Sequence, residues 1–290
     1  MVRIITSDKI RETVRDLCIK ANVRLRPDVL AALKNAYRIE ADKRAKRILR
    51  AILDNAAIAR KESLAVCQDT GLPFVMLGIG QEARITGDLT RAVNKGVEQG
   101  YRRGYFRESI VRDPLMRGAS GYSPAVIHTE IIRGNKVKIA VLPKGFGSEN
   151  KSQSRMFNPT AGIDEIKKFV VESVITAGPD ACPPYVVGVG IGGTADYASF
   201  LAKKALLRSI FRPASRVPAG KAGGRPTGHI KNLEHDLLRR INGLNIGPMG
   251  LGGRSTCLGV NIETSPTHIA GLPVAVNISC HALRSARASI

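Results

Sequence analysis

The 290-residue sequence is poor in aromatic side chains, which make up 4% of it and include no Trp. Proteins that bind single-stranded nucleic acid usually stack bases on aromatic residues beside a basic groove, so this scarcity argues against that class. Apolar stretches such as Tyr185–Gly193 are far shorter than a membrane-spanning helix requires, and the N-terminus lacks the apolar segment of a secretory signal. We therefore expect a cytoplasmic protein that binds neither nucleic acid nor membranes.

Cysteine is also sparse, and its five positions are far apart, at residues 18, 67, 182, 257 and 280. A small secreted domain stapled by disulfides would show an even and closely spaced set, so that class is excluded. What remains is a set of reduced thiols, either free or bound to a metal.

Acidic residues are outnumbered, with 24 Asp and Glu against 45 Lys and Arg, which gives a formal net charge of +21. Such a charge favours an anionic metabolite, an acidic protein surface or nucleic acid as the partner. A general effect of the organism or of solubility explains it equally well. A basic binding module without enzymatic activity therefore stays open at this point.

The first sixty residues have the spacing of amphipathic helices. Apolar residues recur at helical intervals in Lys9–Asn22 and again in Ala41–Lys61, and Pro27 has the position of a first-turn proline in a helix between them. The other face of Ala41–Lys61 carries a run of basic residues, which is typical of a solvated face or a docking surface.

After residue 62 the pattern alternates between strands and helices. Strands are expected at Phe74–Gly80, Ala125–Ile132, Val137–Leu142, Tyr185–Gly190, Leu258–Ile262 and Val274–Ser279. Helices are expected at Asp88–Arg102, Ile163–Ala177, Ala195–Arg208 and His229–Leu244. Gly134-Asn135 is a hairpin signal between two of these strands, and the basic, Pro- and Gly-rich segment Phe211–Gly228 reads as a loop.

These elements indicate a mixed α/β (α+β) fold, with a helical N-terminal part packed on a mixed β-sheet with surrounding helices. No repeat and no convincing linker interrupts the pattern. We therefore expect a single domain over residues 1–290, with a helical segment at 1–62 and a catalytic α/β part at 63–290.

Cys67, Cys182 and Cys280 lie between predicted elements, where loops usually carry function. Cys18 lies on a helical apolar stripe and Cys257 precedes an apolar run, so both are interpreted as small core residues. Three thiolates far apart in sequence suit an iron–sulfur cluster better than structural zinc, whose ligands come in close pairs. Three buried, inert cysteines are the commoner explanation of such spacing.

Gly188, Gly190 and Gly193 match the G-x-G-x-x-G pattern of dinucleotide-binding turns between a strand and a helix. However, no acidic residue follows about twenty positions later, where a ribose partner would lie. Two other interpretations are equal: backbone N–H groups that face an anion, and tight packing of the strand against the helix. An NAD-dependent oxidoreductase ranks below both.

Several polar residues near these loops are candidates for chemistry. Asp69 follows Cys67 by two residues and can transfer a proton, or else serve as a cap or turn residue. Arg107 can hold a carboxylate through two parallel hydrogen bonds, or be an ordinary surface arginine. His268 and His281 flank the last predicted strand, and either can hydrogen-bond near the site.

Four motifs in a fixed order resemble the alpha subunit of class I (iron–sulfur) fumarate hydratase and its relative, L(+)-tartrate dehydratase alpha. They are C-Q-D-T-G at 67–71, K-G-F-G-S-E-N at 144–150, A-C-P-P followed by G-I-G-G-T at 181–194, and L-P-V-A-V-N-x-x-C at 272–280. The resemblance covers nearly the whole chain, and the ordered set is much more specific than any one motif.

The resemblance implies that three cysteines hold a [4Fe–4S] cluster, namely Cys67, Cys182 and Cys280. It also implies a substrate pocket that includes Gln68, Asp69, Arg107, Gly145 and Gly147. Phe146 stands between the two glycines, where the family usually has a third. Single-chain members carry a second half that adds further arginines, a lysine and a threonine to the pocket, and nothing here resembles that half. We therefore expect a separate beta subunit in an alpha2beta2 heterotetramer.

The resulting hypothesis is the reversible hydration of fumarate to (S)-malate, with a dicarboxylate as substrate. It implies Lewis-acid chemistry at the C2 hydroxyl from an iron that lacks a protein ligand. Asp69 would transfer a proton at the departing oxygen, Arg107 would stabilise the added negative charge, and a base on the beta subunit would remove the C3 proton. L(+)-tartrate and methylfumarate are the alternative substrates within this class.

Overall fold

The computed structural model describes residues 2–211 and 228–290, so most of the predicted loop Phe211–Gly228 lies outside the described residues. The chain forms two compact units that interleave along the sequence. Unit 1 consists of Met1–Arg26, Asp54–Phe146 and Arg284–Ile290, and unit 2 consists of Pro27–Leu53 and Gly147–Leu283. Helices and strands mix in both units, which confirms the α+β class.

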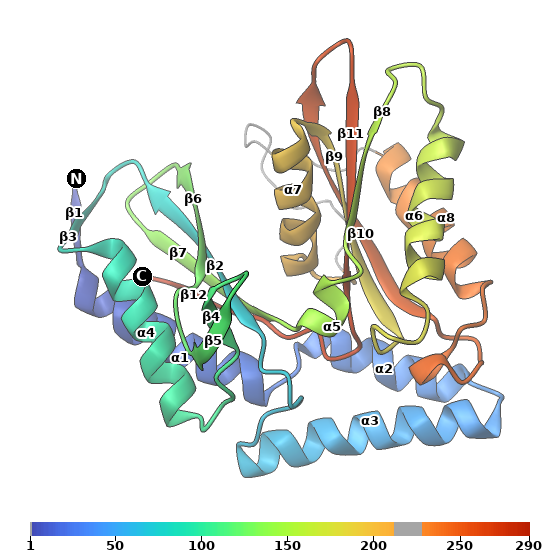
Figure 1. Cartoon of the computed structure of the whole chain (residues 1–290), viewed down its shortest axis with the longest axis horizontal. Helices are drawn as coiled ribbons and strands as arrows, with labels where there is room; N and C mark the ends of the chain where they lie inside the picture. The colour runs from blue at the N-terminus through green and yellow to red at the C-terminus, as the bar shows by residue number, and fades with distance from the viewer. Residues whose placement is uncertain (1, 212–227) are drawn as a thin grey trace. The chain divides into compact units, whose positions relative to one another are not determined.

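Unit 1 is built on a four-stranded sheet in the order β12-β7-β2-β6. The strands are β2 (Leu72–Gly80), β6 (Val126–Ile132), β7 (Val137–Lys144) and β12 (Ala286–Ser289). Helices α1 (Ser7–Val23) and α4 (Leu89–Arg103) pack together on one face of this sheet (Figure 1). Alternate residues of β7, Val137, Ile139 and Val141, are buried there, as the period of two in a strand requires.

Helices α1 and α4 each begin at a side-chain cap. The Thr6 hydroxyl accepts a hydrogen bond from the Lys9 N–H at 3.2 Å, and the Asp88 carboxylate accepts one from the Arg91 N–H at 2.9 Å. Two small sheets complete the unit: β1 (Arg3–Thr6) runs parallel to β3 (Ala83–Thr86), and β4 (Ile110–Asp113) runs antiparallel to β5 (Arg117–Gly121).

The predicted hairpin at Gly134-Asn135 is wrong. β6 and β7 do not pair with each other, because β2 lies between them, parallel to β6 and antiparallel to β7. The link between them wraps over the end of β2, where the Gly80 N–H donates to the Lys136 carbonyl at 3.0 Å. A Cβ on Gly80 would lie 2.1 Å from the Gly134 carbonyl oxygen, so this close wrap requires glycine.

Unit 2 is built on a second four-stranded sheet, in the order β10-β9-β11-β8. Its strands are β8 (Gln153–Phe157), β9 (Tyr185–Gly193), β10 (Cys257–Thr267) and β11 (Leu272–Ser279). Helix α7 (Ala195–Leu207) covers one face, and α6 (Ile163–Ala177) and α8 (Gly228–Asn242) cover the other (Figure 1). The remaining helical elements are α2 (Pro27–Ile39), α3 (Lys43–Glu62), the short α5 (Phe146–Glu149) and the 3-10 turn η1 (Pro248–Gly250).

The glycine pattern in β9 serves packing. A Cβ on Gly188 would lie 2.1 Å from the Ala202 carbonyl oxygen, and one on Gly190 would lie 2.0 Å from that of Ala198. Both glycines therefore let α7 approach β9 closely, and they lie inside a strand rather than in a turn. This confirms the packing interpretation at these two positions, which lie before the turn between β9 and α7.

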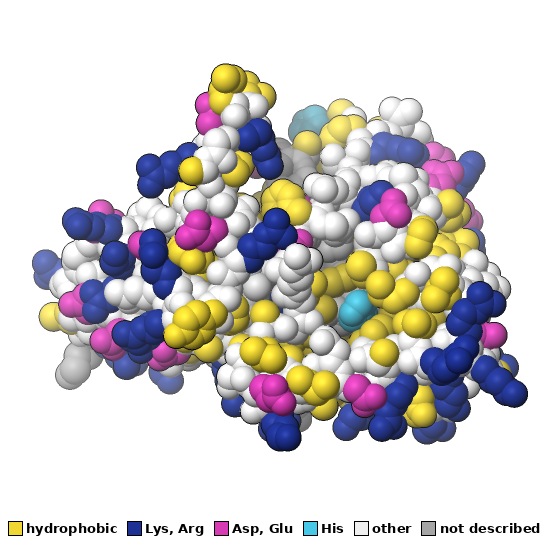
Figure 2. Space-filling view, turned by 60° about the horizontal axis from the view of Figure 1, so that its bottom comes forward, with side chains coloured by type: hydrophobic (Ala, Val, Ile, Leu, Met, Phe, Trp, Pro, Cys, Tyr) yellow, Lys and Arg dark blue, Asp and Glu magenta, His cyan; other side chains and the backbone are white. Residues whose placement is uncertain are grey.

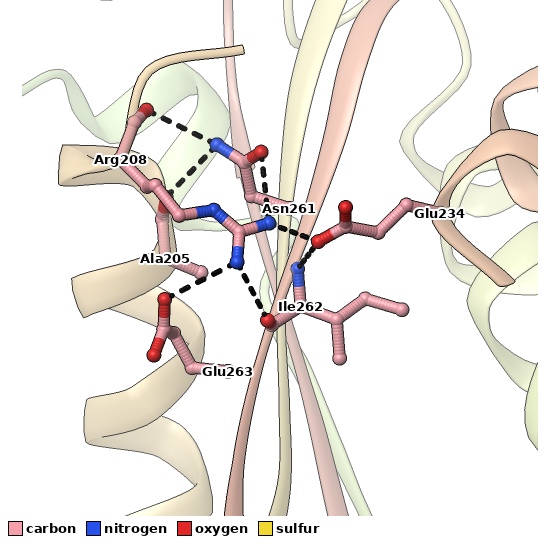
Figure 3. Close-up of polar contacts among 6 residues, drawn as sticks. All are labelled: Ala205, Arg208, Glu234, Asn261, Ile262 and Glu263. Atoms are coloured by element: carbon pink, nitrogen blue, oxygen red, sulfur yellow. Dashed lines mark hydrogen bonds and ion pairs between the residues drawn. The ribbon is translucent and has the colours of Figure 1, made fainter. Parts of the chain in front are cut away.

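A polar network joins α7, α8 and the edge strand β10 around Arg208 (Figure 3). The guanidinium pairs with Glu234, lies 3.4 Å from Glu263, and donates to the Ile262 carbonyl at 3.1 Å. Glu234 also accepts the Ile262 N–H at 2.8 Å. Ile262 lies on the edge strand β10, so its N–H and carbonyl have no neighbouring strand to bond to on this side. The network supplies a partner for each of these two groups.

In the described part of the chain, no helix combines the length and the hydropathy that a membrane crossing needs.

Candidate active site

The loop Cys67–Gly71 of unit 1 connects α3 to β2 and is held by buried groups. Tyr101 of α4 donates its hydroxyl to the Thr70 carbonyl at 2.7 Å, and burial raises the pKa of this phenol, so it remains a neutral donor. Gly71 has φ +74, and a Cβ on it would lie 2.7 Å from the backbone of Lys144. The loop therefore packs closely against the end of β7, where the second motif begins.

Asp69 has both carboxylate oxygens bound by backbone N–H groups. Oδ1 accepts from Gly71 N at 2.9 Å and Oδ2 accepts from Phe146 N at 2.7 Å. A Cβ on Gly145 would lie 3.1 Å from Oδ2, so glycine gives the loop room to approach the carboxylate. The bond to Gly71 is that of a turn residue, as one interpretation predicted. Each oxygen keeps a further acceptor position for chemistry.

The backbone of the same loop rests on a buried cation. Arg284 is 2% exposed and donates through Nη2 to the Asp69 carbonyl. Its Nε is buried without a hydrogen-bond partner among the described residues. The amino group of Lys144, also 2% exposed, lies 3.5 Å from the Gly145 carbonyl. These two cations place positive charge beneath the loop that carries Asp69.

The backbone of Arg107 contacts the same loop. The Thr70 hydroxyl donates to the Arg107 carbonyl at 3.3 Å, and the Arg107 side chain is exposed. No ion pair involves its guanidinium within the part of the chain that the structure describes. Gln68 is exposed and Cys67 half-buried. Unit 1 thus brings Asp69, Gly145 and the Arg107 backbone together, and the guanidinium is available to a ligand.

Unit 2 brings Cys182 and Cys280 together. Strands β9 and β11 are antiparallel, with Val186 opposite Ser279, so the segment before β9 and the segment after β11 leave the same end of the sheet. The His281 N–H donates to the Cys182 carbonyl at 3.2 Å, and His281 Nδ1 lies 3.1 Å from the same oxygen. His281, one of the two histidines expected to hydrogen-bond near the site, thus contacts the backbone of Cys182, and the site itself stays a prediction.

Cys182 is held in a left-handed backbone conformation, with φ +56. A residue other than glycine in this region costs of order 1–3 kcal/mol, and such residues concentrate at functional sites. Its N–H donates to the Pro179 carbonyl at 3.1 Å, and its carbonyl receives the His281 contacts. Hydrogen bonds of both its N–H and its carbonyl thus fix the backbone of Cys182 and the direction of its Cα–Cβ bond.

The second half of the K-G-F-G-S-E-N motif docks on the same sheet. Glu149 pairs with Lys203 of α7 and accepts from the Asn277 amide at 3.0 Å, and the same amide donates to the Ser152 hydroxyl at 2.9 Å. A Cβ on Gly147 would lie 3.8 Å from the Asp180 carbonyl, close to Cys182 in the chain. Gly147 therefore belongs with Cys182 in unit 2, whereas Gly145 belongs with Asp69 in unit 1.

The five cysteines fall into two classes of environment. Cys18 and Cys257 are buried, and burial raises the pKa of both thiols, that of Cys257 to about 12, which disfavours the thiolate that binds metal. Cys67, Cys182 and Cys280 are only partly buried. The core interpretation of Cys18 and Cys257 is confirmed, and the other three thiols lie outside the core.

The donor set suits iron and sulfide in its chemistry, because soft thiolates on loops are the usual ligands of such clusters. Two of the three thiols belong to unit 2 and one to unit 1. Among the described residues, no three His, Cys, Asp or Glu side chains lie close enough together to hold a metal ion. The assignment of Cys67, Cys182 and Cys280 as a ligand set stays a prediction.

Three supporting residues were missed in the sequence analysis: Tyr101, Asn277 and Arg284. Asn277 had a usable signal, because it is the polar residue within the apolar run 272–278, and such a residue needs a buried partner. Tyr101 follows the apolar stripe of α4 and resembles a core residue. Arg284 is one of 45 basic residues, and nothing local distinguishes it from a surface arginine.

Comparison with known proteins gives a consistent result. The family model described as "Fumarate hydratase (Fumerase)" matches residues 11–289. A protein of Methanocaldococcus jannaschii named "Putative L(+)-tartrate dehydratase subunit alpha" is 40% identical over 286 residues, which cover 96% of each chain. The L(+)-tartrate dehydratase subunit alpha of Escherichia coli K12 is 31% identical over 281 residues, covering 96% of this chain and 89% of the relative.

Proposed function

Because the chain belongs to the fumarate hydratase (Fumerase) family, we propose that it is the alpha subunit of a [4Fe–4S]-dependent hydro-lyase that reversibly hydrates fumarate to (S)-malate. Membership in this family makes the chain a hydro-lyase. The proposal adds the substrate, the cluster and a separate beta subunit in an alpha2beta2 heterotetramer. It also treats residues 1–290 as one alpha-type domain, with a helical segment at 1–62, that works in the cytoplasm.

The observation that carries the proposal is the pair of partly exposed cysteines that His281 links at one end of the unit 2 sheet. Cys182 and Cys280 would hold the cluster together with Cys67 of unit 1. When bound there, the cluster would supply Lewis-acid chemistry at the substrate hydroxyl. His281 would fix the Cys182 loop so that both thiols of unit 2 keep their direction.

Asp69 is proposed to carry the proton of the water or hydroxyl oxygen. In the hydration direction the carboxylate takes one proton from water while the oxygen bonds to C2, and in the dehydration direction it returns that proton to the leaving hydroxide. The N–H groups of Gly71 and Phe146 hold the carboxylate in one orientation throughout. Because these backbone donors are fixed, the carboxylate has the same orientation for proton transfer in every turnover.

Arg107 is proposed to bind one substrate carboxylate. Its exposed guanidinium can form two parallel hydrogen bonds with that group and can stabilise the charge that builds on it when the C3 proton leaves. Gln68, Gly145 and Gly147 complete the part of the pocket proposed for this chain. The C3 base and additional cationic groups are proposed to come from the beta subunit, and the name "subunit alpha" among the relatives supports the existence of such a partner.

L(+)-tartrate is the second candidate substrate, and a specific observation favours it. The relative at 40% identity is named "Putative L(+)-tartrate dehydratase subunit alpha", and the one at 31% identity is named "L(+)-tartrate dehydratase subunit alpha". Tartrate differs from malate by a hydroxyl at C3, so the same acid–base groups can act on both. A pocket that hydrogen-bonds this extra hydroxyl would discriminate strongly between the two substrates.

The proposal is tested by producing the chain anaerobically together with its beta subunit. We expect iron and acid-labile sulfide in equal amounts in the purified complex, and loss of water from (S)-malate to give fumarate, measured by ultraviolet absorbance. Parallel assays with L(+)-tartrate and methylmalate identify the substrate by the highest kcat/KM. A complex that dehydrates tartrate alone would overturn the fumarate assignment, and an active complex without iron would overturn the cluster.

A further inference from the structure

Strands β4 and β5 form an arm, residues 110–121, in which Ile110 is buried at the root and residues 112–120 are all exposed. The two strands pair only with each other within the described residues. A Cβ on Gly118 or on Gly121 would meet no atom within 4 Å, so β5 has open space on its flank. An isolated two-stranded ribbon is marginally stable in water, and a partner surface would supply the layer that it lacks.

The tip of the arm presents two large apolar side chains to solvent. Leu115 is 88% exposed and Met116 is 83% exposed. In the space-filling view, a narrow projection at the place of the arm ends in hydrophobic side chains (Figure 2). Single exposed apolar residues are ordinary on protein surfaces, but two neighbours at the end of a projection form a patch that suits insertion into a pocket.

The tip is preformed rather than loose. One oxygen of Asp113 accepts a hydrogen bond from Leu115 N at 2.8 Å and another from Met116 N at 2.9 Å. Both bonds lower the pKa of Asp113, and the bond from Met116 has the larger effect. Arg117 closes the turn in a left-handed conformation, with φ +65. A turn with this much local bonding loses little conformational entropy when its side chains are buried by a partner.

The root of the arm leads directly to the candidate active site. Arg107 precedes β4 by three residues, and the Thr70 hydroxyl binds its carbonyl at 3.3 Å. Phe106, which is buried, packs edge-on against Tyr101 at 5.5 Å between ring centres, and Tyr101 holds the Cys67–Gly71 loop. A chain that completes the site at Asp69 and Arg107 must therefore lie close to the root of this arm.

We propose that the β4–β5 arm is a docking element for the separate beta subunit, with Leu115 and Met116 inserting into an apolar pocket that has an acidic rim. This inference rests on the proposed function. The basic residues beside the tip, Arg112 and Arg117, are exposed and match an acidic rim. A second copy of this chain is a poor occupant, because two molecules of formal charge +21 repel each other.

The test replaces both tip residues with glutamate, Leu115→Glu together with Met116→Glu, in the full chain. The control is Ile175→Glu on α6 of unit 2, where the side chain is 54% exposed. Circular dichroism verifies that both proteins fold, and the affinity for the purified beta subunit is measured by calorimetry. We expect the tip variant to bind at least about tenfold more weakly and the control to bind like the wild type.

Activity distinguishes docking from chemistry. When the beta subunit is titrated into the tip variant, half-maximal activity should need more beta subunit, whereas the maximal rate should equal that of the wild type. Unchanged affinity would overturn the arm proposal and leave the proposed function intact. Failure of the wild-type chain to bind any beta subunit would overturn the two-subunit function and the arm with it. Loss of self-association alone would assign the arm to a second copy and overturn the proposal.

Discussion

Cys182 and Cys257 offer a matched comparison of thiols within one unit. Serine at Cys67, Cys182 or Cys280 is expected to remove the visible absorbance of the cluster, because a serine hydroxyl is a poor ligand for iron in such clusters. Serine at Cys257 should retain colour and activity, since this buried thiol has a pKa of about 12 and bonds to the Gly259 carbonyl at 3.2 Å. Absorbance, iron content and turnover of anaerobic preparations measure the difference. A coloured, active Cys182→Ser protein would contradict the ligand assignment.

Arg107 is expected to act through its geometry more than through its charge. Arg107→Lys keeps the positive charge but loses the two parallel donors, so KM for malate should rise roughly tenfold. The cluster absorbance should remain, because Arg107 contributes only its carbonyl to the loop. Arg103→Lys, at the exposed end of α4, is the control and should leave the kinetics unchanged. Identical KM values for Arg107→Lys and the wild type would remove Arg107 from the pocket.

At the scale of elements, the packing of α7 on β9 depends on glycine. Gly190→Ala would place a Cβ 2.0 Å from the Ala198 carbonyl and 2.6 Å from the Ala202 nitrogen. Both neighbours are backbone atoms of α7, so the helix must shift, and we expect a loss of about 3 kcal/mol in the free energy of unfolding. Gly121→Ala has no atom within 4 Å and should change stability little. Urea unfolding of the two variants measures the contrast, and equal midpoints would contradict this account.

The pairing of α6 with α8 predicts a pH dependence of stability. Arg239, Lys167 and Arg240 surround Asp236 and hold the pKa of its carboxyl well below its ordinary value. A carboxyl with a lowered pKa in the folded state stabilises the fold above its unfolded pKa of about 4, and this contribution is lost as the pH falls below that value. Asp236→Asn should therefore lower the melting temperature at pH 7, and the difference from the wild type should shrink towards pH 3.

The control for this pH profile is Glu172→Gln on α6, whose carboxylate has ion-pair partners only at 3.9 and 4.0 Å among the described residues. Its melting curve should follow the wild type across the range. A constant offset between Asp236→Asn and the wild type from pH 3 to pH 7 would show that Asp236 stabilises by packing instead of charge.

Pattern predicted the main helices by their single apolar stripe, and it predicted β9 and β11 as short apolar runs because both of their faces are buried. The predicted helix Ile163–Ala177 has the bounds observed for α6, and Lys9–Asn22 lies inside α1. The predicted hairpin failed because Gly134-Asn135 specifies a turn but not which strand lies beside the next one. Short strands such as β12 escaped prediction because four residues carry too little pattern.

On the scale of the whole molecule, the division of the predicted site motifs between two units could not be read from the sequence. The motif at 144–150 crosses the boundary, with Gly145 beside Asp69 in unit 1 and Gly147 beside Asp180 in unit 2. Contact patterns of this kind depend on which strands pair, and no local signal in a glycine-bearing loop encodes that. The supporting groups Arg284 and Tyr101 were missed for the same reason, since their roles exist only after distant segments meet.

The net charge of the chain predicts how the rate of its association with the beta subunit depends on salt. With a formal charge of +21, this chain should be steered towards an acidic beta subunit at low ionic strength. We expect the association rate constant to fall as NaCl rises from 20 to 300 mM, because the Debye length shortens from roughly 20 Å to about 6 Å. The dissociation rate constant should change much less, since short-range packing of apolar side chains governs it.

Stopped-flow mixing of the two subunits measures both constants, with potassium acetate at equal ionic strength as a control for specific ions. An association rate that is indifferent to salt would show that the positive charge of this chain does not serve assembly.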